Sequence, residues 1–311
     1  MNYARISGTG SYLPEKVLTN QDIEKIVDTS DEWIQERTGI KSRHVTAEGE
    51  NATDMAAHAL RRALDSAGKM PQDLDLIIVA TCTAHRRFPS VATQLQNILG
   101  IREFPAFDLN AACSGFIYGL NLADTMVRNG QVRCAAVIGT EHMSSLIDWS
   151  DRSTCVLFGD GAGAVIVEPS EEQGIISTHI HADGSYLDLL YHDVTTGKIA
   201  MEGNKVFRVA VKTLERIVDE TLEANQLDRS VVDWLLPHQA NLRIMLATAE
   251  KLGLEENRVI ITVDEHGNTS AASIPLALDV GIARGQIKRG EVLLMESFGA
   301  GFTWGSALVR Y

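Results

Sequence analysis

The sequence predicts an α/β protein made of two similar halves, each with a mixed, largely parallel β-sheet. Apolar, strand-like segments alternate with amphipathic, helix-like segments along the chain, and this alternation is typical of parallel strands covered by helices. The second half also repeats the first. Gly130-Gln-Val matches Gly285-Gln-Ile at an offset of 155 residues, and Asp75-Leu-Ile-Ile matches Asp233-Trp-Leu-Leu at an offset of 158. Such a repeat indicates an internal duplication.

The expected elements follow the same order in both halves, with helices assigned from 3.6-residue spacing and strands from short apolar runs. In the first half we expect helix, strand, helix, strand, helix and strand over residues 53–68, 74–80, 92–99, 106–109, a segment opening at Cys113, and 134–138. The corresponding segments of the second half are 206–224, 234–236, 242–252, 259–263, a helix opening at Asn268, and 292–295. No Pro- or Ser-rich linker separates the halves, so we divide the chain into residues 1–170 and 171–311.

Composition excludes several classes of protein. The chain has 311 residues, 45% hydrophobic and 22% charged, which is ordinary usage for a globular protein with a substantial core. The net charge of −13 argues against nucleic acid as a partner, because phosphate binding needs a basic surface. No apolar stretch approaches the roughly 20 residues that cross a bilayer, and the first residues lack a signal-peptide pattern. We therefore expect a cytoplasmic protein without a membrane segment, and its four cysteines should be free thiols.

Cys113 is the first candidate for a reactive residue. It lies where an apolar, extended segment turns into an amphipathic helix, in Asp108-Leu-Asn-Ala-Ala-Cys113-Ser-Gly-Phe116. At a helix N-terminus, unpaired N–H groups and the helix dipole favour a thiolate and offer donors to an oxyanion, so we expect a lowered pKa and a nucleophile. The alternative is a small apolar residue packed at a strand–helix junction.

His238 and Asn268 follow strands of the second half and favour the functional interpretation of Cys113. The offset of 155 places Cys113 opposite Asn268, and the offset of 158 places Ala80 opposite His238. Ligands of open α/β sheets bind outside the carboxyl ends of strands. Cys113, His238 and Asn268 are therefore expected to converge in one cleft between the two halves.

A series of motifs along the whole chain resembles the β-ketoacyl-acyl carrier protein synthase III family, the initiating condensing enzymes of bacterial fatty acid synthesis within the thiolase superfamily. The resemblance covers essentially all 311 residues and implies a thiolase-like fold with layers in the order α-β-α-β-α. The motifs are Gly8-Thr-Gly-Ser-Tyr-Leu-Pro14, Thr29-Ser-Asp-Glu-Trp33, Arg37-Thr-Gly-Ile40, Ala112-Cys113-Ser-Gly-Phe116, Phe158-Gly-Asp-Gly-Ala-Gly-Ala164, Pro237-His238-Gln-Ala-Asn-Leu-Arg243, His266-Gly-Asn268-Thr-Ser270 and Gly301-Phe-Thr-Trp-Gly305.

The resemblance implies a decarboxylating condensation without a metal or other cofactor. An acyl group, commonly acetyl, would pass from acyl-CoA to Cys113 and then condense with malonyl-acyl carrier protein, giving CO2 and a 3-oxoacyl-acyl carrier protein. His238 and Asn268 would donate hydrogen bonds to the malonyl thioester oxygen. The backbone N–H groups of Cys113 and Ala300 would form the oxyanion hole, although relatives commonly have glycine where this chain has Ala300.

The same resemblance implies the remaining site residues and a homodimer. Phe207 would line the active site, and Phe88 would limit the acyl pocket of the partner subunit. The expected coenzyme A contacts are Trp33 and Arg152 around the adenine, Thr29 and Arg37 near the nucleotide and its phosphates, and Gly203 and Asn241 beside the pantetheine. The expected carrier-protein contacts are Arg208, Gln239, Ala240, Asn241, Leu242, Arg243 and Lys251, with Glu250 standing where relatives often carry lysine.

Three other functions remain as alternatives. A related acyltransferase could use longer acyl donors to make a signal or secondary metabolite, because the segment from Tyr191 to Met201 is shorter than in typical relatives. A Cys-His-Asn hydrolase could cleave acyl thioesters, although the residues around His238 and Asn268 argue against it. A noncatalytic carrier-binding protein would have no use for Cys113. The sequence leaves open whether the donor is acetyl, branched or longer.

Overall fold

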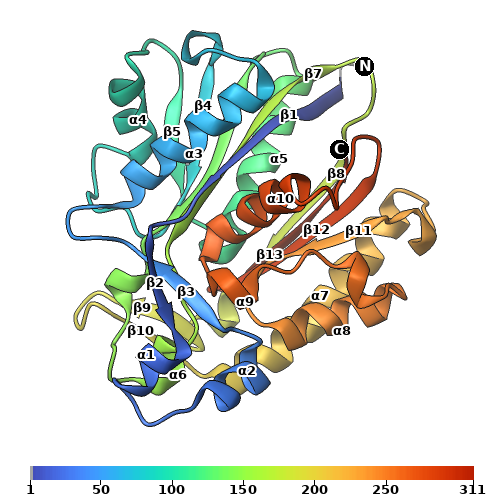
Figure 1. The fold of residues 1–311 in the computed structure, drawn as a ribbon. Coiled ribbons are helices and arrows are strands. Elements are labelled where there is room, and N and C mark those ends of the chain that lie inside the picture. Colours follow the sequence, from blue (N-terminus) through green and yellow to red (C-terminus); the bar gives the residue numbers. More distant parts are fainter. Residues whose placement is uncertain (1–2) are drawn as a thin grey trace.

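Two large sheets and three layers of helices form the body of the molecule, which the computed structural model describes over residues 3–311 (Figure 1). Helices α3 (Ala52–Ala67) and α4 (Val91–Leu99) cover the outer face of the first sheet. Helices α5 (Gly115–Arg128) and α10 (Ser273–Ala283) lie between the two sheets. Helices α7 (Gly203–Ala224) and α8 (Leu242–Leu252) cover the outer face of the second sheet. The expected order α-β-α-β-α is confirmed.

The first sheet has five strands in the order β1 (Tyr3–Tyr12), β7 (Gly161–Ser170), β6 (Ala135–Glu141), β4 (Leu76–Ala80) and β5 (Ala106–Leu109). Strand β4 is parallel to both β5 and β6, whereas β7 is antiparallel to β6 and β1. All five residues of β4 are buried. Its alternate side chains pack against α5 on one face and α3 on the other, which explains the unbroken apolar run.

The second sheet repeats this arrangement with one strand fewer. Its order is β11 (Trp234–Pro237), β12 (Val292–Gly299), β13 (Thr303–Arg310) and β8 (Ile175–Ala182). Strands β11 and β12 are parallel, and the other two pairings are antiparallel. The expected duplication and mixed sheets are therefore confirmed. Parallel pairing does not predominate, however. In the first sheet β7 is antiparallel to both β6 and β1, and in the second sheet β13 is antiparallel to both β12 and β8.

The remaining elements are two small two-stranded sheets, β2–β3 and β9–β10, and short helices, and most of them lie at the lower left of Figure 1. They are the strands β2 (Lys16–Thr19), β3 (Ser42–Val45), β9 (Leu190–Asp193) and β10 (Lys198–Met201), and the short helices α1 (Asn20–Glu24), α2 (Asp31–Thr38), α6 (Arg152–Cys155) and α9 (Val263–His266). Short 3-10 turns cover Pro71–Asp73, Ala112–Ser114, Met143–Leu146, Gly184–Tyr186, Arg229–Val231, Glu256–Arg258 and Ser270–Ala272. No helix of the described part is long and apolar enough to cross a membrane.

The strand expected over residues 259–263 is wrong, and the reason is a buried side chain. Only Val259 pairs, in an isolated bridge with Leu235. The Gln239 amide oxygen accepts the N–H groups of Thr262 and Val263 at 2.9 and 3.0 Å, and its nitrogen donates to the Ile260 carbonyl at 3.0 Å. Gln239 thus takes the backbone hydrogen bonds that a neighbouring strand would have used.

The expected pairing of Cys113 with Asn268 is also wrong. The turns that precede α5 and α10 each begin at a non-glycine residue with positive φ, Ala112 at 46° and Ser270 at 51°. These two residues are 158 positions apart, so the counterpart of Cys113 is Ala271. The helix expected to open at Asn268 begins at Ser273, 158 positions after Gly115, and it has 11 residues where α5 has 14. The offset of 155 applies only to the C-terminal ends of these helices.

Candidate active site

The turn that carries Cys113 is held by strands of the other half of the chain. Ser297 Oγ on β12 donates to the Cys113 carbonyl at 2.8 Å, and Thr303 Oγ1 on β13 donates to the Ala111 carbonyl at 2.7 Å. Ser114 Oγ donates back to the Thr303 carbonyl at 3.1 Å. The nucleophile candidate is therefore fixed by a hydrogen-bonded clamp from the second sheet.

Gly299 allows the closest approach between that turn and β12. A Cβ atom at this position would lie 2.8 Å from the Cys113 nitrogen and 3.2 Å from the Ser114 nitrogen. These are backbone atoms, which cannot move aside as the end of a side chain can. A glycine is therefore required where β12 ends beside Cys113.

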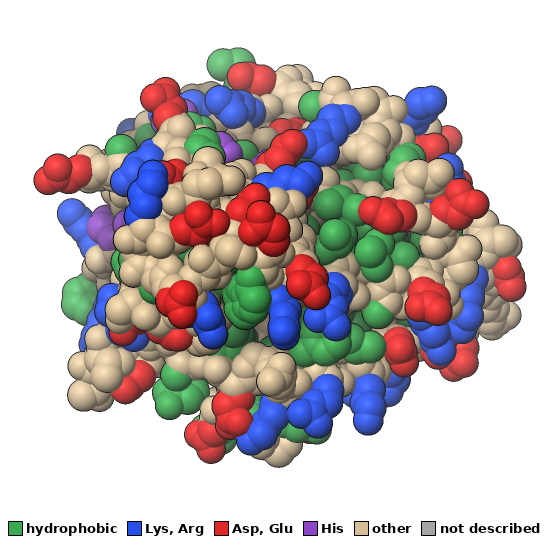
Figure 2. All heavy atoms as spheres, turned by 60° about the horizontal axis from the view of Figure 1, so that its bottom comes forward, with side chains coloured by type: hydrophobic (Ala, Val, Ile, Leu, Met, Phe, Trp, Pro, Cys, Tyr) green, Lys and Arg blue, Asp and Glu red, His purple; other side chains and the backbone are tan. Residues whose placement is uncertain are grey.

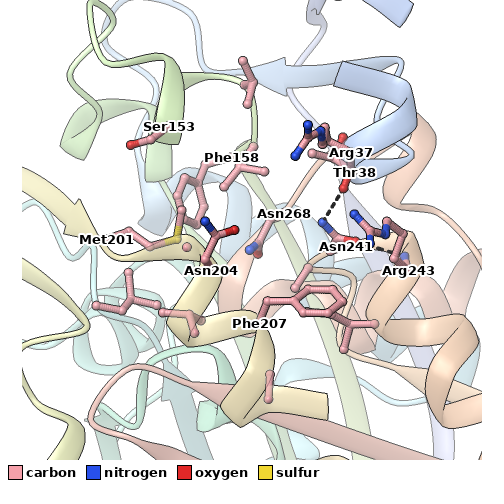
Figure 3. Close-up of a pocket in the computed structure, with 18 of the residues that line it drawn as sticks. Arg37, Thr38, Ser153, Phe158, Met201, Asn204, Phe207, Asn241, Arg243 and Asn268 are labelled. Atoms are coloured by element: carbon pink, nitrogen blue, oxygen red, sulfur yellow. Dashed lines mark hydrogen bonds between the residues drawn. The ribbon is translucent and has the colours of Figure 1, made fainter. Parts of the chain in front are cut away.

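Cys113, His238 and Asn268 line one cavity of about 640 Å³. The expected residues Trp33, Arg37, Arg152, Gly203, Phe207, Ala240, Asn241 and Arg243 line the same cavity, and Figure 3 shows several of them around it. The convergence of the three candidate catalytic side chains agrees with the argument from strand ends. This cavity is the candidate active site.

His238 lies at the end of β11 with only 6% of its surface exposed. Its Nδ1 is 2.6 Å from Ser273 Oγ, which also accepts the Gln239 N–H at 3.3 Å. This contact occupies Nδ1, and when Ser273 is the donor the imidazole proton lies on Nε2. Burial lowers the pKa of His238 to about 3. The site therefore holds a neutral imidazole, and we assign its proton to Nε2, where it can serve as a donor.

Asn268 lies just before the Ser270 turn and has a fixed amide orientation. Its backbone N–H donates to the Leu157 carbonyl at 2.8 Å, and its Oδ1 accepts the Ser270 N–H at 2.9 Å. The Nδ2 group is consequently the part of the amide left to interact with a substrate. Figure 3 shows Asn268 among the residues around the cavity. His238 and Asn268 thus supply two neutral donors.

Cys113 differs from the expectation in the direction of its pKa. Although the residue as a whole is half-buried, desolvation of the thiol raises the pKa of Cys113 to about 12. The Ser270 hydroxyl acts in the opposite direction. The position at a helix N-terminus therefore does not by itself lower this pKa, because the cost of burying a thiolate is larger.

One end of the cavity brings together Trp33 and two arginines. The guanidinium carbons of Arg152 and Arg37 lie 5.0 and 5.6 Å from the Trp33 ring centroid. Asn241 Nδ2 donates to the Arg37 carbonyl at 2.9 Å, and its Oδ1 accepts the Arg243 N–H at 3.0 Å, as the dashed lines of Figure 3 mark. Asn241 therefore links α2 to the N-terminus of α8.

Arg243 also contacts Phe207, with its guanidinium carbon 5.3 Å from the ring centroid. Figure 2, which brings the bottom of Figure 1 forward, shows apolar side chains exposed among basic and acidic ones on this face. Arg208 is exposed on α7. Lys251 is paired with Asp219 at 2.9 Å, so much of its charge is neutralised within the chain.

Several expected residues do not line the cavity. Gln239 is 1% exposed and its amide is fully used by backbone groups, which leaves no polar atom for a carrier protein. Leu242 packs against Gly39. Thr29 precedes α2, Ala300 follows β12 beside the clamp, and Phe88 projects from a loop with 84% of its surface exposed.

Sequence reasoning missed much of the apolar lining. Val206, Ala210 and Leu214 follow one another at four-residue spacing on α7, a stripe that could have been recognised beside Phe207. The other missed residues are Thr38, Ser153, Val156, Leu157, Phe158, Leu190, Met201, Asn204, Ile244 and Phe298. They come from the ends of helices α2, α6, α7 and α8, from loops, from β12 and from the β9–β10 hairpin, and no single periodic pattern marks them.

Two family models match the chain. One, described as 3-oxoacyl-[acyl-carrier-protein (ACP)] synthase III, matches residues 107–184. The other, described as the C terminal part of 3-oxoacyl-[acyl-carrier-protein (ACP)] synthase III, matches residues 222–311. Together they include all three candidate catalytic residues.

Full-length relatives agree with the family models. The chain is 58% identical to the β-ketoacyl-[acyl-carrier-protein] synthase III of Thioalkalivibrio sulfidiphilus over 100% of both chains. The crystal structure of 3-oxoacyl-[acyl-carrier-protein] synthase III from Aquifex aeolicus VF5 is 50% identical, with a TM-score of 0.96 over 99% of this chain and 100% of that chain. The corresponding structure from Pseudomonas aeruginosa PAO1 is 38% identical, with a TM-score of 0.94 over 99% and 98%.

Proposed function

The chain belongs to the β-ketoacyl-acyl carrier protein synthase III family of condensing acyltransferases, and we propose that Cys113 carries the acyl group that this chain condenses with a malonyl thioester. The observation that carries the assignment of residues is the convergence of Cys113 with the two neutral donors His238 and Asn268 in one cavity. We propose initiation of fatty acid synthesis in the cytoplasm as the role of the reaction.

Acyl loading is the first step. The Cys113 thiolate attacks the thioester carbon of acyl-CoA, a new carbon–sulfur bond forms, and the coenzyme A thiolate leaves and takes a proton. The backbone N–H groups of Cys113 and Ala300 are the proposed donors to the tetrahedral oxyanion. The clamp from Ser297 and Thr303 supports this role, because it fixes the peptide groups on either side of the one that holds the Cys113 N–H.

Condensation is the second step. Loss of CO2 from the malonyl thioester leaves its electron pair in an enolate, and the Nε2–H of His238 and the Nδ2–H of Asn268 stabilise the enolate oxygen. The carbanion attacks the acyl carbon on Cys113, and the cysteine sulfur leaves. The product is a 3-oxoacyl thioester. Neutral donors suit this step, because they stabilise the developing charge without burying a second ion. The proposed steps use no metal or cofactor.

Donor recognition is proposed at the Trp33 end of the cavity. Trp33 and Arg152 would hold the adenine by stacking, Thr29 and Arg37 would contact the nucleotide, and Gly203 and Asn241 would face the pantetheine. An acidic carrier protein would dock at Arg243, Arg208 and the loop from Gln239 to Leu242. The internal ion pair of Lys251 makes its contribution smaller than that of Arg243.

A homodimer is proposed as the active unit. Strand β5 is an edge of the first sheet with partly exposed residues, and Phe88 presents a large exposed ring on the loop before α4. A second copy would cover both features. Sedimentation at several protein concentrations should give twice the mass of one chain. Truncation by Phe88→Ala should widen the range of accepted acyl chains if the partner's ring limits the pocket.

Product analysis tests the function directly. The protein is mixed with acetyl-, isobutyryl- or octanoyl-CoA and malonyl-acyl carrier protein, and products are separated by mass spectrometry, with Cys113→Ala as the control. A 3-oxoacyl-acyl carrier protein that depends on Cys113 supports the proposal. Release of free acid without carbon–carbon bond formation would instead identify a thioester hydrolase. Preference for octanoyl would identify a donor outside primary fatty acid initiation.

A further inference from the structure

Glu141 is a fully buried carboxylate beside the active site that the reaction steps above do not use. It ends β6 with 0% of its surface exposed. Its oxygens accept hydrogen bonds from Thr83 Oγ1 at 2.5 Å and from the Cys82 N–H at 3.2 Å. Thr81 Oγ1 and the Cys82 thiol donate at 3.3 and 3.4 Å. Hydroxyl, thiol and backbone N–H groups therefore hold this carboxylate.

Ser270 connects Glu141 to the catalytic residues. Its Oγ donates to Glu141 Oε1 at 3.1 Å, and its N–H donates to Asn268 Oδ1 at 2.9 Å. Ser270 is 1% exposed, its turn packs against the turn that carries Cys113, and its hydroxyl opposes the rise in the pKa of the Cys113 thiol. The hydroxyl thus lies between a buried carboxylate and the thiol that must lose a proton.

We propose that Glu141 receives the Cys113 proton through the Ser270 hydroxyl during acyl loading. The Cys113 S–H proton passes to Ser270 Oγ while the Ser270 hydroxyl proton passes to Glu141 Oε1, which leaves a thiolate and a neutral carboxyl group. When the thiolate has attacked acyl-CoA, the same path returns a proton to the departing coenzyme A sulfur. No net proton is gained or lost. The inference rests on the proposed role of Cys113 as acyl carrier.

Two features of the site create the need for this relay. Burial raises the pKa of Cys113 to about 12, so the thiolate does not form unaided near neutral pH. His238 is a poor acceptor for this proton, because burial lowers its pKa to about 3. Burial also raises the pKa of Glu141, opposed by its hydrogen bonds, which makes it a stronger base than an exposed carboxylate.

The titratable groups that face Glu141 are two thiols. Cys82 comes from the loop after β4, and Cys113 comes from the turn before α5. The turn before α10 contributes only the Ser270 hydroxyl. A pH dependence of loading that disappears on altering Glu141 would therefore belong to the thiol–carboxylate pair and not to a neighbouring lysine or arginine.

The test compares Glu141→Gln and Ser270→Ala with Glu296→Gln. Ser270→Ala removes the hydroxyl but keeps the N–H that orients Asn268. Glu296→Gln makes the same change as Glu141→Gln at a carboxyl group that is 1% exposed on β12. Three rates are measured in each protein: acyl transfer from acetyl-CoA to Cys113 in a single turnover, alkylation of Cys113 by iodoacetamide across pH, and decarboxylation of malonyl-CoA. Mass spectrometry assigns alkylation to Cys113 and separates it from Cys82.

We expect Glu141→Gln and Ser270→Ala to slow acyl transfer at neutral pH by about a hundredfold, the usual contribution of a positioned acid or base. Alkylation of Cys113 should require higher pH in both variants. Decarboxylation should stay close to that of the wild type, and Glu296→Gln should load normally. If Ser270→Ala leaves loading and alkylation unchanged, or lowers decarboxylation as much as loading, the relay is wrong. A wild-type protein that never acylates Cys113 would overturn the proposed function instead.

Discussion

The turns before α5 and α10 have similar backbone geometry but different proposed roles. Each begins at a residue with positive φ near 50°, Ala112 in one half and Ser270 in the other. The first presents Cys113, the proposed nucleophile, whereas the second presents Ala271, and the proposed donor Asn268 precedes it. The duplicated turn therefore keeps its backbone conformation in both halves but presents different side chains.

Each turn is also held by the opposite half of the chain. Ser297 on β12 fixes the Cys113 turn, and Glu141 on β6 fixes the Ser270 turn. Strands β6 and β12 occupy corresponding places in the two sheets. Neither half therefore contains the complete candidate site, because each half holds the turn before α5 or α10 that belongs to the other half.

The largest expected effect separates the roles of the two turns. Cys113→Ala should abolish acyl loading and condensation but leave malonyl decarboxylation, whereas His238→Ala or Asn268→Ala should lose decarboxylation and still accept an acyl group. Each loss should be roughly a hundredfold or more, as for removal of a nucleophile or an oxyanion donor. Separate assays of the two half-reactions check this. Equal losses of both half-reactions in all three variants would contradict the division.

Two glycine substitutions test whether close packing against each turn supports a separate half-reaction. A Cβ at Gly299 would meet the Cys113 nitrogen at 2.8 Å, and one at Gly139 would meet the Ala271 carbonyl oxygen at 2.2 Å. We expect Gly299→Ala to lower acyl loading more than decarboxylation, and Gly139→Ala to do the reverse.

Both glycine variants should also lose about 1–3 kcal/mol of stability through overpacking, with Gly139→Ala the less stable. Denaturant unfolding and the two half-reaction rates together provide the measurement. Gly285→Ala is a surface control for added side-chain bulk, because nothing lies within 4 Å of the Cβ position, although its φ of +71° adds local strain. Identical activity profiles for the two glycine variants would show that the turns do not act separately.

Ser273 offers a smaller effect confined to the donor side. Ser273→Ala removes the hydrogen bond to His238 Nδ1, so the imidazole can redistribute its proton between the two nitrogens. Losing the free energy of one hydrogen bond from the transition state should slow decarboxylation by roughly tenfold. Acyl loading should be unaffected. Nitrogen NMR of the imidazole should show Nε2 protonation in the wild type and a mixed tautomer in the variant; an unchanged tautomer would remove Ser273 from this role.

Titration of a second buried glutamate should affect stability alone and neither half-reaction. Neither carboxylate oxygen of Glu296 has a hydrogen-bond partner among residues 3–311, in contrast to those of Glu141. Burial raises the pKa of Glu296 to about 8 from the ordinary 4.5, although the Thr248 hydroxyl opposes this rise. Between these pH values the folded chain retains a proton that the unfolded chain has lost. The stabilisation is therefore complete below pH 4.5 and is lost as pH rises through 8.

Relative to Glu296→Gln, the wild type should lose a few kcal/mol across this range, since one pKa unit corresponds to about 1.4 kcal/mol. Thermal unfolding of both proteins at several pH values measures the difference. Because every other titrating group is shared, only Glu296 changes the gap between the two curves. A constant gap would show that Glu296 does not titrate abnormally.

Local patterns predicted the alternation of strands and helices in two similar halves and the convergence of Cys113, His238 and Asn268, whereas the order of the layers followed from the family resemblance. The apolar runs of β4 and β11 and the motifs around Cys113, His238 and Asn268 carried that information. The prediction of a strand over 259–263 was wrong, because the side-chain amide of Gln239, more than 20 residues earlier, makes hydrogen bonds with the backbone N–H and C=O groups of that segment. The prediction of a lowered pKa for Cys113 was wrong, because desolvation depends on every element that packs over the thiol. Tertiary contacts of this kind leave no periodic signal.

The contact between Trp33 and Arg152 bears on how the proposed donor would enter and leave. The Arg152 guanidinium lies over the Trp33 ring, 5.0 Å from its centroid. An adenine held between these two side chains, as proposed, would have to separate them, so the free energy of their cation–π contact would be subtracted from the free energy of base binding. The contact would re-form when coenzyme A leaves, which would favour dissociation.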